Sequence, residues 1–131
     1  MIELPIRTTE RNQLINITTE VQSAVGKSKA KNGICVVYCP HTTTAIAITE
    51  KADAGVLKDI ISKLAEFAPH GKKYFHEEGN SDAHIKSSII GNSRIVLFKD
   101  GRLMLGTWEG IFFCEFDGPR DRKILLSILG E

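Results

Sequence analysis

The chain has 131 residues, a formal net charge of +1, 42% hydrophobic residues and 25% charged residues. These values are ordinary for a globular protein, and we treat residues 1–131 as a single domain. The nearly balanced charge argues against a nucleic-acid-binding module that relies on bulk basic charge. No apolar run approaches the roughly 20 residues that span a bilayer, and the N-terminus lacks the features of a signal peptide. We therefore expect a cytoplasmic protein with no nucleic-acid or membrane partner.

The N-terminal part of the chain predicts two strands and a helix. Ile2–Arg7 alternates apolar and polar residues, as in a strand with one buried face, and its internal proline favours a sheet edge. Gln13–Ile17 is expected to return as the second strand of a hairpin. A helix should start near Glu20, after a threonine N-cap, and end at Asn32-Gly33, two residues that tolerate positive φ.

The middle of the chain predicts a buried strand, a second strand and a long helix. Ile34–Cys39 is apolar on both faces and rich in β-branched residues, which favours a central position in a sheet. Extended structure resumes at Thr43–Thr49. Apolar residues then recur at helical spacing from about Asp53 to Ala68, so these residues should form the longest helix of the chain.

The C-terminal half predicts a short helix and four strands. A loop at 70–79 leads into a helix over Asp82–Ile90, which Gly91-Asn92 should terminate. Asp100-Gly101 is the strongest hairpin signal, because Asp-Gly suits a type I′ turn. The strands of the expected antiparallel series are Arg94–Phe98, Arg102–Trp108, Ile111–Phe116 and Lys123–Leu129. The fold class is α+β, with antiparallel, sandwich-like sheets built from hairpins, two main helices and one short helix.

The three cysteines are predicted to be free thiols in the core. Cys35 and Cys39 lie four residues apart on one strand, which separates their Cα atoms by about 13 Å. A disulfide needs Cα atoms within about 7 Å, so these two residues cannot pair along an extended strand. Cys114 falls in another apolar run and is interpreted in the same way, as a small buried hydrophobic residue.

Histidines and acids crowd into one short polar stretch. Residues 76–84 contain two histidines, three acids and an amide. Imidazole and carboxylate oxygens are common ligands of zinc and similar ions, so we consider a divalent metal, zinc or magnesium, held by His41, His76 and His84. On an ideal helix Asp82 and His84 point about 200° apart, whereas Glu78 in the loop is freer to reach the same ion.

Hydroxyl and guanidinium groups supply candidates for anion binding. Thr42 and Thr43 follow His41 and could bind a phosphate or satisfy backbone groups of the loop. Arg102 and Arg120 follow glycine-containing turns, and a guanidinium binds phosphate oxygens as a bidentate fork. The alternative is that both arginines pair with surface acids. Trp108 and the phenylalanines at 112–116 are interpreted as core residues.

Several of these motifs, taken together, resemble one known family over essentially the whole chain. The matching pieces are Asn16-Ile17-Thr18, His41-Thr42-Thr43, Glu50, Gly79-Asn80-Ser81-Asp82-Ala83-His84-Ile85-Lys86, Gly91, Leu105-Gly106-Thr107-Trp108-Glu109, Glu115-Phe116-Asp117-Gly118-Pro119-Arg120 and Gly130-Glu131. The chain resembles the YjbQ family of small proteins. In this chain His76 is followed at once by Glu77-Glu78, so its loop is shorter than the family usually has.

The resemblance implies an α+β fold that assembles as a homotrimer, with a polar, metal-binding pocket around the histidine motifs. It also implies a secondary thiamine-phosphate synthase activity, in which an aminopyrimidine diphosphate and a thiazole phosphate are joined and pyrophosphate is expelled. His41 and His84 are the principal site residues that it transfers to this sequence. Glu78, Asn80 and Asp82 accompany them.

From these observations we expect an enzyme that acts on a small phosphorylated metabolite. The expected catalytic residues are His41, His84, Glu78 and Asp82, and the expected phosphate- or substrate-binding residues are Thr42, Thr43, Asn80, Arg102 and Arg120. Two alternatives remain open: a metal-assisted hydrolase, in which His84 or Glu78 activates water, and a non-catalytic trimer that binds a metabolite or a partner and regulates it.

Overall fold

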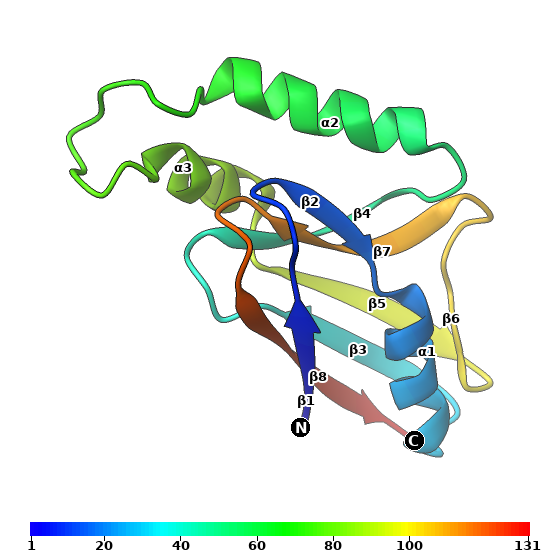
Figure 1. Ribbon diagram of the computed structural model, residues 1–131. Helices are drawn as coiled ribbons and strands as arrows, with labels where there is room; N and C mark the ends of the chain where they lie inside the picture. Colours follow the sequence, from blue (N-terminus) through cyan, green and yellow to red (C-terminus); the bar gives the residue numbers. More distant parts are fainter.

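The structure, a computed structural model, describes all 131 residues as two antiparallel sheets and three helices (Figure 1). The five-stranded sheet has the order β1 (Ile2–Arg7), β8 (Asp121–Gly130), β3 (Gly33–Tyr38), β5 (Ser93–Lys99) and β6 (Arg102–Leu103). The three-stranded sheet has the order β2 (Gln13–Asn16), β7 (Glu109–Glu115) and β4 (Thr44–Glu50). The helices are α1 (Thr18–Lys27), α2 (Ala54–Phe67) and α3 (Ser81–Ile90). The predicted α+β class is confirmed.

The main core lies between the two sheets and α1. Each strand of the large sheet turns alternate residues inward, as Cys35 and Val37 of β3 show, while Ile46 of β4 and Phe113 of β7 come from the small sheet. Val21 and its neighbours on α1 close the core on one side. Burial of these apolar side chains is the main source of stability in a domain of this size.

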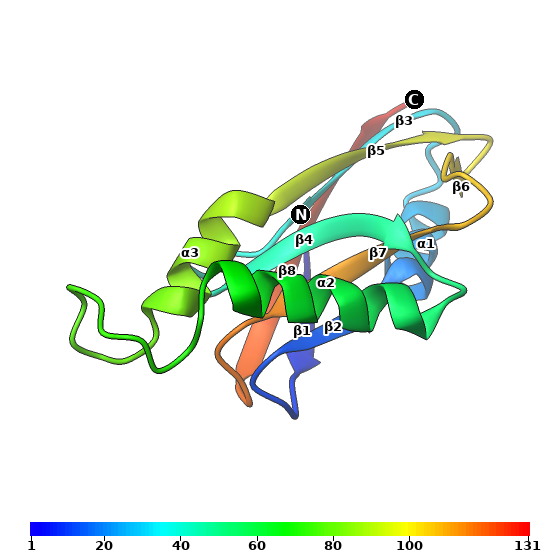
Figure 2. The same cartoon turned by 90° about the horizontal axis from the view of Figure 1, so that it is seen from above.

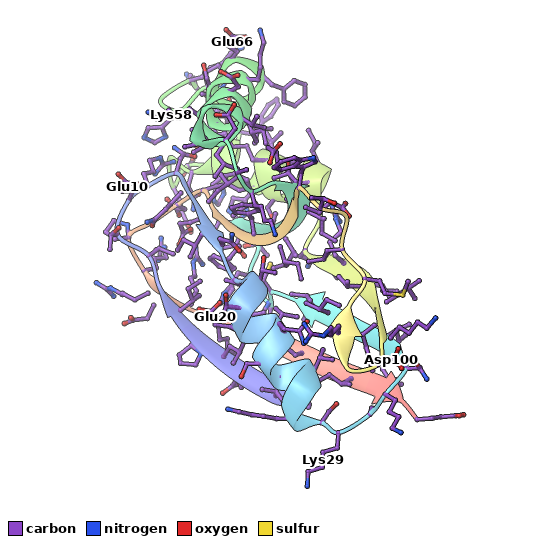
Figure 3. All side chains as sticks on the ribbon, turned by 90° about the vertical axis from the view of Figure 1, so that its right-hand side faces the viewer. Glu10, Glu20, Lys29, Lys58, Glu66 and Asp100 are labelled. Atoms are coloured by element: carbon purple, nitrogen blue, oxygen red, sulfur yellow. The ribbon has the colours of Figure 1, made fainter.

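The other two helices lie on the small sheet. In Figure 2, α2 runs across the outer side of this sheet and α3 lies beside the start of β4. A second, smaller apolar cluster forms there around Ala83, Cys114 and Phe116. No side chain of α2 is fully buried, and Lys58 and Glu66 point away from the sheets in Figure 3. The long helix therefore buries little of its surface against the sheet. None of the three helices is long and apolar enough to cross a membrane.

Several local predictions from sequence are confirmed. β3 is central, between β8 and β5, and β1 lies at the edge of its sheet. Asp100 and Gly101 both have positive φ, at 51° and 74°, as the type I′ turn between β5 and β6 requires. The helix expected from about Asp53 to Ala68 is α2, Ala54–Phe67, and Asp53 caps it by accepting a hydrogen bond from the Gly55 N–H at 2.8 Å. All three cysteines are free and buried.

The expected N-terminal hairpin is wrong. β1 pairs with β8 and β2 pairs with β7, so the two strands belong to different sheets. The connecting segment leaves one sheet for the other because its polar side chains have buried partners there. Thr8 donates to Glu115 Oε1 at 2.8 Å, and Arg11 pairs with Asp82 and Asp117.

The expected strand over Arg102–Trp108 is also wrong, since β6 ends at Leu103. Beyond it the chain turns toward the small sheet, and the Glu109 carboxylate accepts a hydrogen bond from the Gly106 N–H at 2.8 Å. Trp108 lies in this connection with 63% of its surface exposed, so it is not the core residue that we expected. The four C-terminal strands divide between two sheets and do not form one antiparallel series.

Candidate functional site

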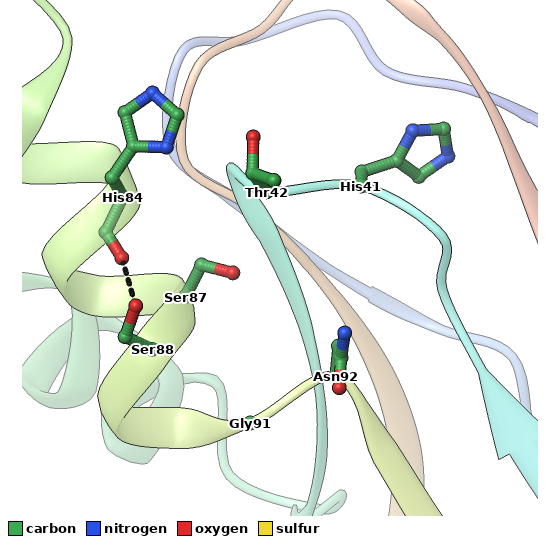
Figure 4. A pocket seen from close by; sticks show the side chains of 7 residues that line it. All are labelled: His41, Thr42, His84, Ser87, Ser88, Gly91 and Asn92. Atoms are coloured by element: carbon green, nitrogen blue, oxygen red, sulfur yellow. Dashed lines mark hydrogen bonds between the residues drawn. The ribbon is translucent and has the colours of Figure 1, made fainter.

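His41 and His84 line one pocket of about 320 Å³ (Figure 4). The two histidines come from segments that are distant in the sequence, the loop after β3 and the first turns of α3. None of the lining residues is hydrophobic, and the other five are Thr42, Ser87, Ser88, Gly91 and Asn92. A concave site lined only by imidazole, hydroxyl, amide and backbone groups suits a small, polar ligand.

The wall formed by α3 is fixed by hydrogen bonds of its serines. Ser88 donates to the carbonyl of His84 one turn earlier at 2.8 Å, as the dashed line in Figure 4 shows. Ser87 donates to the carbonyl of Thr44 at 2.6 Å and thereby ties the helix to β4. The helix ends at Gly91, whose φ of 91° only glycine adopts without strain. Asn92 follows and completes this side of the pocket.

His41 is held by the backbone of β8 beyond the end of β3. Its Nε2 lies 3.1 Å from the backbone nitrogen of Lys123 and 3.2 Å from the carbonyl oxygen of the same residue. The pairing of β3 with β8 stops at Tyr38 and Leu125, so β3 does not pair with Lys123. Burial, helped by the nearby charge of Arg122, lowers the pKa of His41 below its ordinary value. The neutral ring is therefore favoured. It accepts from the Lys123 N–H through Nε2, which leaves Nδ1 as the N–H donor.

A buried ion pair lies behind this part of the site. Arg122 donates to both carboxylate oxygens of Glu115, at 2.8 and 2.6 Å, and its Nη2 also donates to Thr43 Oγ1 at 2.7 Å. Burial alone would raise the pKa of Glu115, but hydrogen bonds from Arg122 and from the Asp117 backbone hold it below its ordinary value. Thr43 thus serves this network and does not line the pocket.

Asp82 lies on the face of α3 that points away from the pocket. It is buried and accepts from Arg11 at 3.0 Å, from Lys86 at 3.3 Å and from His70 at 3.3 Å. Although burial would raise the pKa of Asp82, the hydrogen bond from His70 and the two positive charges hold it below its ordinary value. The divergence of Asp82 and His84 that helical spacing implies is therefore observed.

Asp117 forms the other half of this acidic network. Arg11 donates to its Oδ1 at 2.9 Å, while Asn80 and Arg120 donate to its Oδ2 at 2.9 and 3.0 Å. Arg120 therefore pairs with an acid, as the alternative interpretation held, and Asn80 holds the start of α3 against the turn before β8. Burial would raise the pKa of Asp117, but these partners, with the hydrogen bond from Asn80 foremost, lower it.

The remaining candidates lie at the margin of the pocket or far from it. The rings of His76 and His84 meet edge to face with their centroids 5.3 Å apart, and His76 Nε2 lies 3.6 Å from Glu78 Oε2. Arg102 is exposed on β6, at the far end of the large sheet. Nowhere in the chain do three or more His, Cys, Asp or Glu side chains converge as metal ligands. One chain by itself thus does not fit the expected metal.

Sequence reasoning missed several residues of this region. Ser87, Ser88 and Asn92 carry no motif signal of their own, although a helical plot places Ser88 one turn after His84. Arg122 was overlooked because it sits in a strand of alternating pattern. An arginine at an inward-facing strand position is a signal for a buried acidic partner, and Glu115 occupies the corresponding position on β7.

The fold and site together define an α+β protein with two antiparallel sheets and a polar histidine pocket where β3 ends and β5 begins in the larger sheet. The family model described as "UPF0047 protein YjbQ-like" matches residues 2–131. This chain belongs to the YjbQ/UPF0047 family.

Relatives and solved structures agree with this assignment. The chain is 49% identical to a UPF0047 protein of Methanocaldococcus jannaschii, over 100% of this chain and 95% of that protein. It is 45% identical to the UPF0047 protein YugU of Bacillus subtilis, over 97% of each chain. A crystal structure of a YjbQ/UPF0047 family protein from Clostridium acetobutylicum has a TM-score of 0.97 and 47% identity, and the match covers 98% of this chain and 100% of that one.

Proposed function

We propose that this protein is an enzyme that acts on a small phosphorylated metabolite in the pocket between His41 and His84. The observation that carries the proposal is that two histidines, from distant segments, line one pocket without a hydrophobic lining residue. A chain that needed only to fold would gain little from leaving both imidazoles beside an open polar cavity. Histidine is also the side chain best suited to proton transfer near neutral pH.

The chemistry of the pocket supports a division of roles. His41, with its lowered pKa, is neutral at physiological pH and offers an N–H donor at Nδ1. His84 provides a second imidazole on the α3 side of the pocket. The hydroxyl of Thr42 and the amide of Asn92 are donors for phosphate oxygens, whereas the O–H of Ser88 is used by the His84 carbonyl. Proton transfer to a departing phosphate group is the step that this arrangement serves best.

Thiamine-phosphate synthesis is the specific reaction that we propose to test first. In that reaction a carbon–nitrogen bond forms between the aminopyrimidine and the thiazole phosphate. The carbon–oxygen bond to the diphosphate breaks, and pyrophosphate leaves with the electron pair. The assay should follow pyrophosphate release with both substrates present, and His41→Ala and His84→Ala should each lower the rate by about 10²–10⁴-fold.

The matched control for this assay is His70→Gln, which removes a histidine outside the pocket. Its rate should stay within about threefold of the wild type. Phosphate binding by the wild type that both pocket substitutions abolish, without turnover of any substrate, would instead favour a binding and regulatory protein. Unchanged rates in both pocket variants would refute the proposed site.

We further propose that the chain assembles as a homotrimer through the outer face of its large sheet. We call this surface the outer face; its most exposed members are Tyr38, Ile95, Leu97, Met104 and Leu129, which are 37–63% exposed. They account for half of the large hydrophobic residues that the chain exposes, and no helix covers them (Figure 2). A contiguous apolar face of this kind marks an interaction surface. Light scattering after size-exclusion chromatography should give three times the mass of the chain.

A further inference from the structure

The pocket lacks a positive charge of its own. The basic side chains around it have other partners: Arg122 is buried against Glu115, and Lys123 lies 3.4 Å from Glu3. Arg94 lies behind Gly91 and donates to the carbonyls of Ser93 and Ile90. No arginine or lysine lines the cavity. A phosphoryl group carries up to two negative charges, and sites that transform it neutralise this charge with arginine, lysine or a metal ion. The site that a single chain presents is therefore incomplete for the function proposed above.

A free guanidinium lies at the other end of the outer face. In the strand register of the β5–β6 hairpin, Arg102 lies opposite Lys99, and its side chain is exposed. It takes part in none of the ion pairs of the chain. Leu103 packs on the core, so Arg102 and Met104, on either side of it, point outward with the outer face.

The outer face is continuously apolar between Arg102 and the pocket. By strand register, Ile34 of β3 lies between Leu97 of β5 and Leu129 of β8, and the Met104 N–H donates to the Leu97 carbonyl at 2.8 Å. This apolar row crosses β8, β3 and β5 and ends at Met104, just after β6 and two residues from Arg102. At the opposite end, β3 finishes at Tyr38, three residues before His41 of the pocket.

We propose that a second copy of this chain seats head to tail on the outer face and places its Arg102 in the pocket of the first. This inference rests on the proposed function. The two ends of the face are complementary, since one has anion-binding donors without a cation and the other has a cation without a partner. A head-to-tail contact uses two different patches of the same chain and closes into a ring when its rotation permits, as a trimer requires. Each pocket would then combine His41 and His84 of one subunit with Arg102 of the next.

The first test is phosphate binding by the full chain, measured by isothermal titration calorimetry with inorganic phosphate and with pyrophosphate. Arg102→Ala should weaken binding by roughly 10- to 100-fold, because a bidentate, charge-assisted contact is lost. The assembly should keep its mass, since the apolar face is unchanged. Lys58→Ala, which removes an exposed charge on the far side of α2 (Figure 3), is the control and should bind as the wild type does.

The decisive test mixes two inactive chains. Arg102→Ala and His84→Ala chains with different tags are co-expressed, and the mixed assemblies are purified through both tags. If Arg102 acts in the neighbouring pocket, any mixed trimer contains one pocket with both residues intact, so about one site in three should bind phosphate at wild-type affinity. If both residues act within one chain, no intact site forms and binding stays at the level of the parents.

The possible failures can be told apart. A wild-type chain that binds neither phosphate nor pyrophosphate would refute the proposed function. If Arg102→Ala binds phosphate as tightly as the wild type, or if the mixed trimers do not regain wild-type binding, the shared site is refuted. The proposed function is not refuted by either result. Leu97→Glu places a charge on the outer face and should yield monomers with the weak binding of Arg102→Ala. The shared site would also be refuted if Leu97→Glu monomers kept full affinity for phosphate. It would likewise be refuted if the wild type were monomeric, since the outer face would then bind a different partner.

Discussion

Arg122 and Glu115 face each other on neighbouring inward positions of β8 and β7, joined by two hydrogen bonds of 2.8 and 2.6 Å. The arginine is 7% exposed and the glutamate is fully buried. The same guanidinium holds Thr43, one residue beyond the pocket, at 2.7 Å. The pair therefore links the two sheets directly behind the site.

Removing one member of this pair should cost more than removing both. Arg122→Met leaves Glu115 buried without a counter-charge, and we expect a loss of about 3–5 kcal/mol in the free energy of unfolding. Adding Glu115→Gln to that variant should recover part of the loss, because the isolated charge is then gone. Urea denaturation of the wild type, both single variants and the double variant measures the coupling. A loss in the double variant equal to the sum of the two single losses would show that the pair is not coupled.

Acid should destabilise the fold in a defined range of pH. The pKa values of Asp82, Glu115 and Asp117 all lie below their ordinary values in the folded chain. Between the folded pKa and the ordinary value near 4, the unfolded chain binds more protons than the folded one, so stability falls as pH falls. We expect full stability from these groups above about pH 5 and a progressive loss below it. Chemical denaturation at pH 3, 4, 5 and 7 tests this, and a midpoint that does not change would contradict it.

Two glycines should respond in opposite directions to replacement by alanine. A Cβ at Gly118 would meet the Glu10 carbonyl oxygen, with Glu115 Cγ at 2.8 Å and Thr8 Oγ1 at 2.9 Å. Gly118→Ala should therefore destabilise the chain by about 1–3 kcal/mol, since the neighbouring backbone must move. Gly26 in α1 has open space around it, so Gly26→Ala should be neutral or stabilise by up to about 1 kcal/mol. Thermal unfolding of both variants is the measurement. If the close contacts at Gly118 are the cause, only Gly118→Ala should lower the stability, whereas a loss in both variants would mean that the chain tolerates neither replacement.

Metal content tests the divalent ion that the sequence suggests. The His76 ring contacts that of His84, and His76 Nε2 lies 3.6 Å from Glu78 Oε2, but these three side chains do not converge as a metal site within one chain. Because three ligands do not converge within one chain, we expect the purified wild type to retain no stoichiometric zinc or magnesium by elemental analysis. An ion that is present in the wild type and absent from His84→Ala would instead place the metal at His84. An ion that persists in His84→Ala would place the metal elsewhere. His70→Gln, outside this group, is the control for an indirect effect on folding.

Much of the local structure followed from the sequence because short-range rules decide it. The alternation of Ile2–Arg7, the helical stripe after Asp53 and the Asp100-Gly101 turn depend on residues within one element or one turn, and each appears in the structure. The motif residues His41 and His84 could also be selected as candidates, because a histidine beside a strand end or on the polar side of a helix is visible in one dimension. The family resemblance over the whole chain was likewise readable from the motifs alone, and it is confirmed.

Only the tertiary structure decided which strands pair and which polar groups meet. The segment between β1 and β2 contains ordinary turn residues, yet it crosses between sheets because Thr8 and Arg11 find buried acids on β7, on α3 and in the turn before β8. Strand pairing between distant parts of the chain depends on this long-range complementarity, which no local pattern encodes. The same reason gives Asp82 its buried partners, brings Ser88 and Asn92 to the pocket, and leaves Arg102 at the far end of an uncovered apolar face.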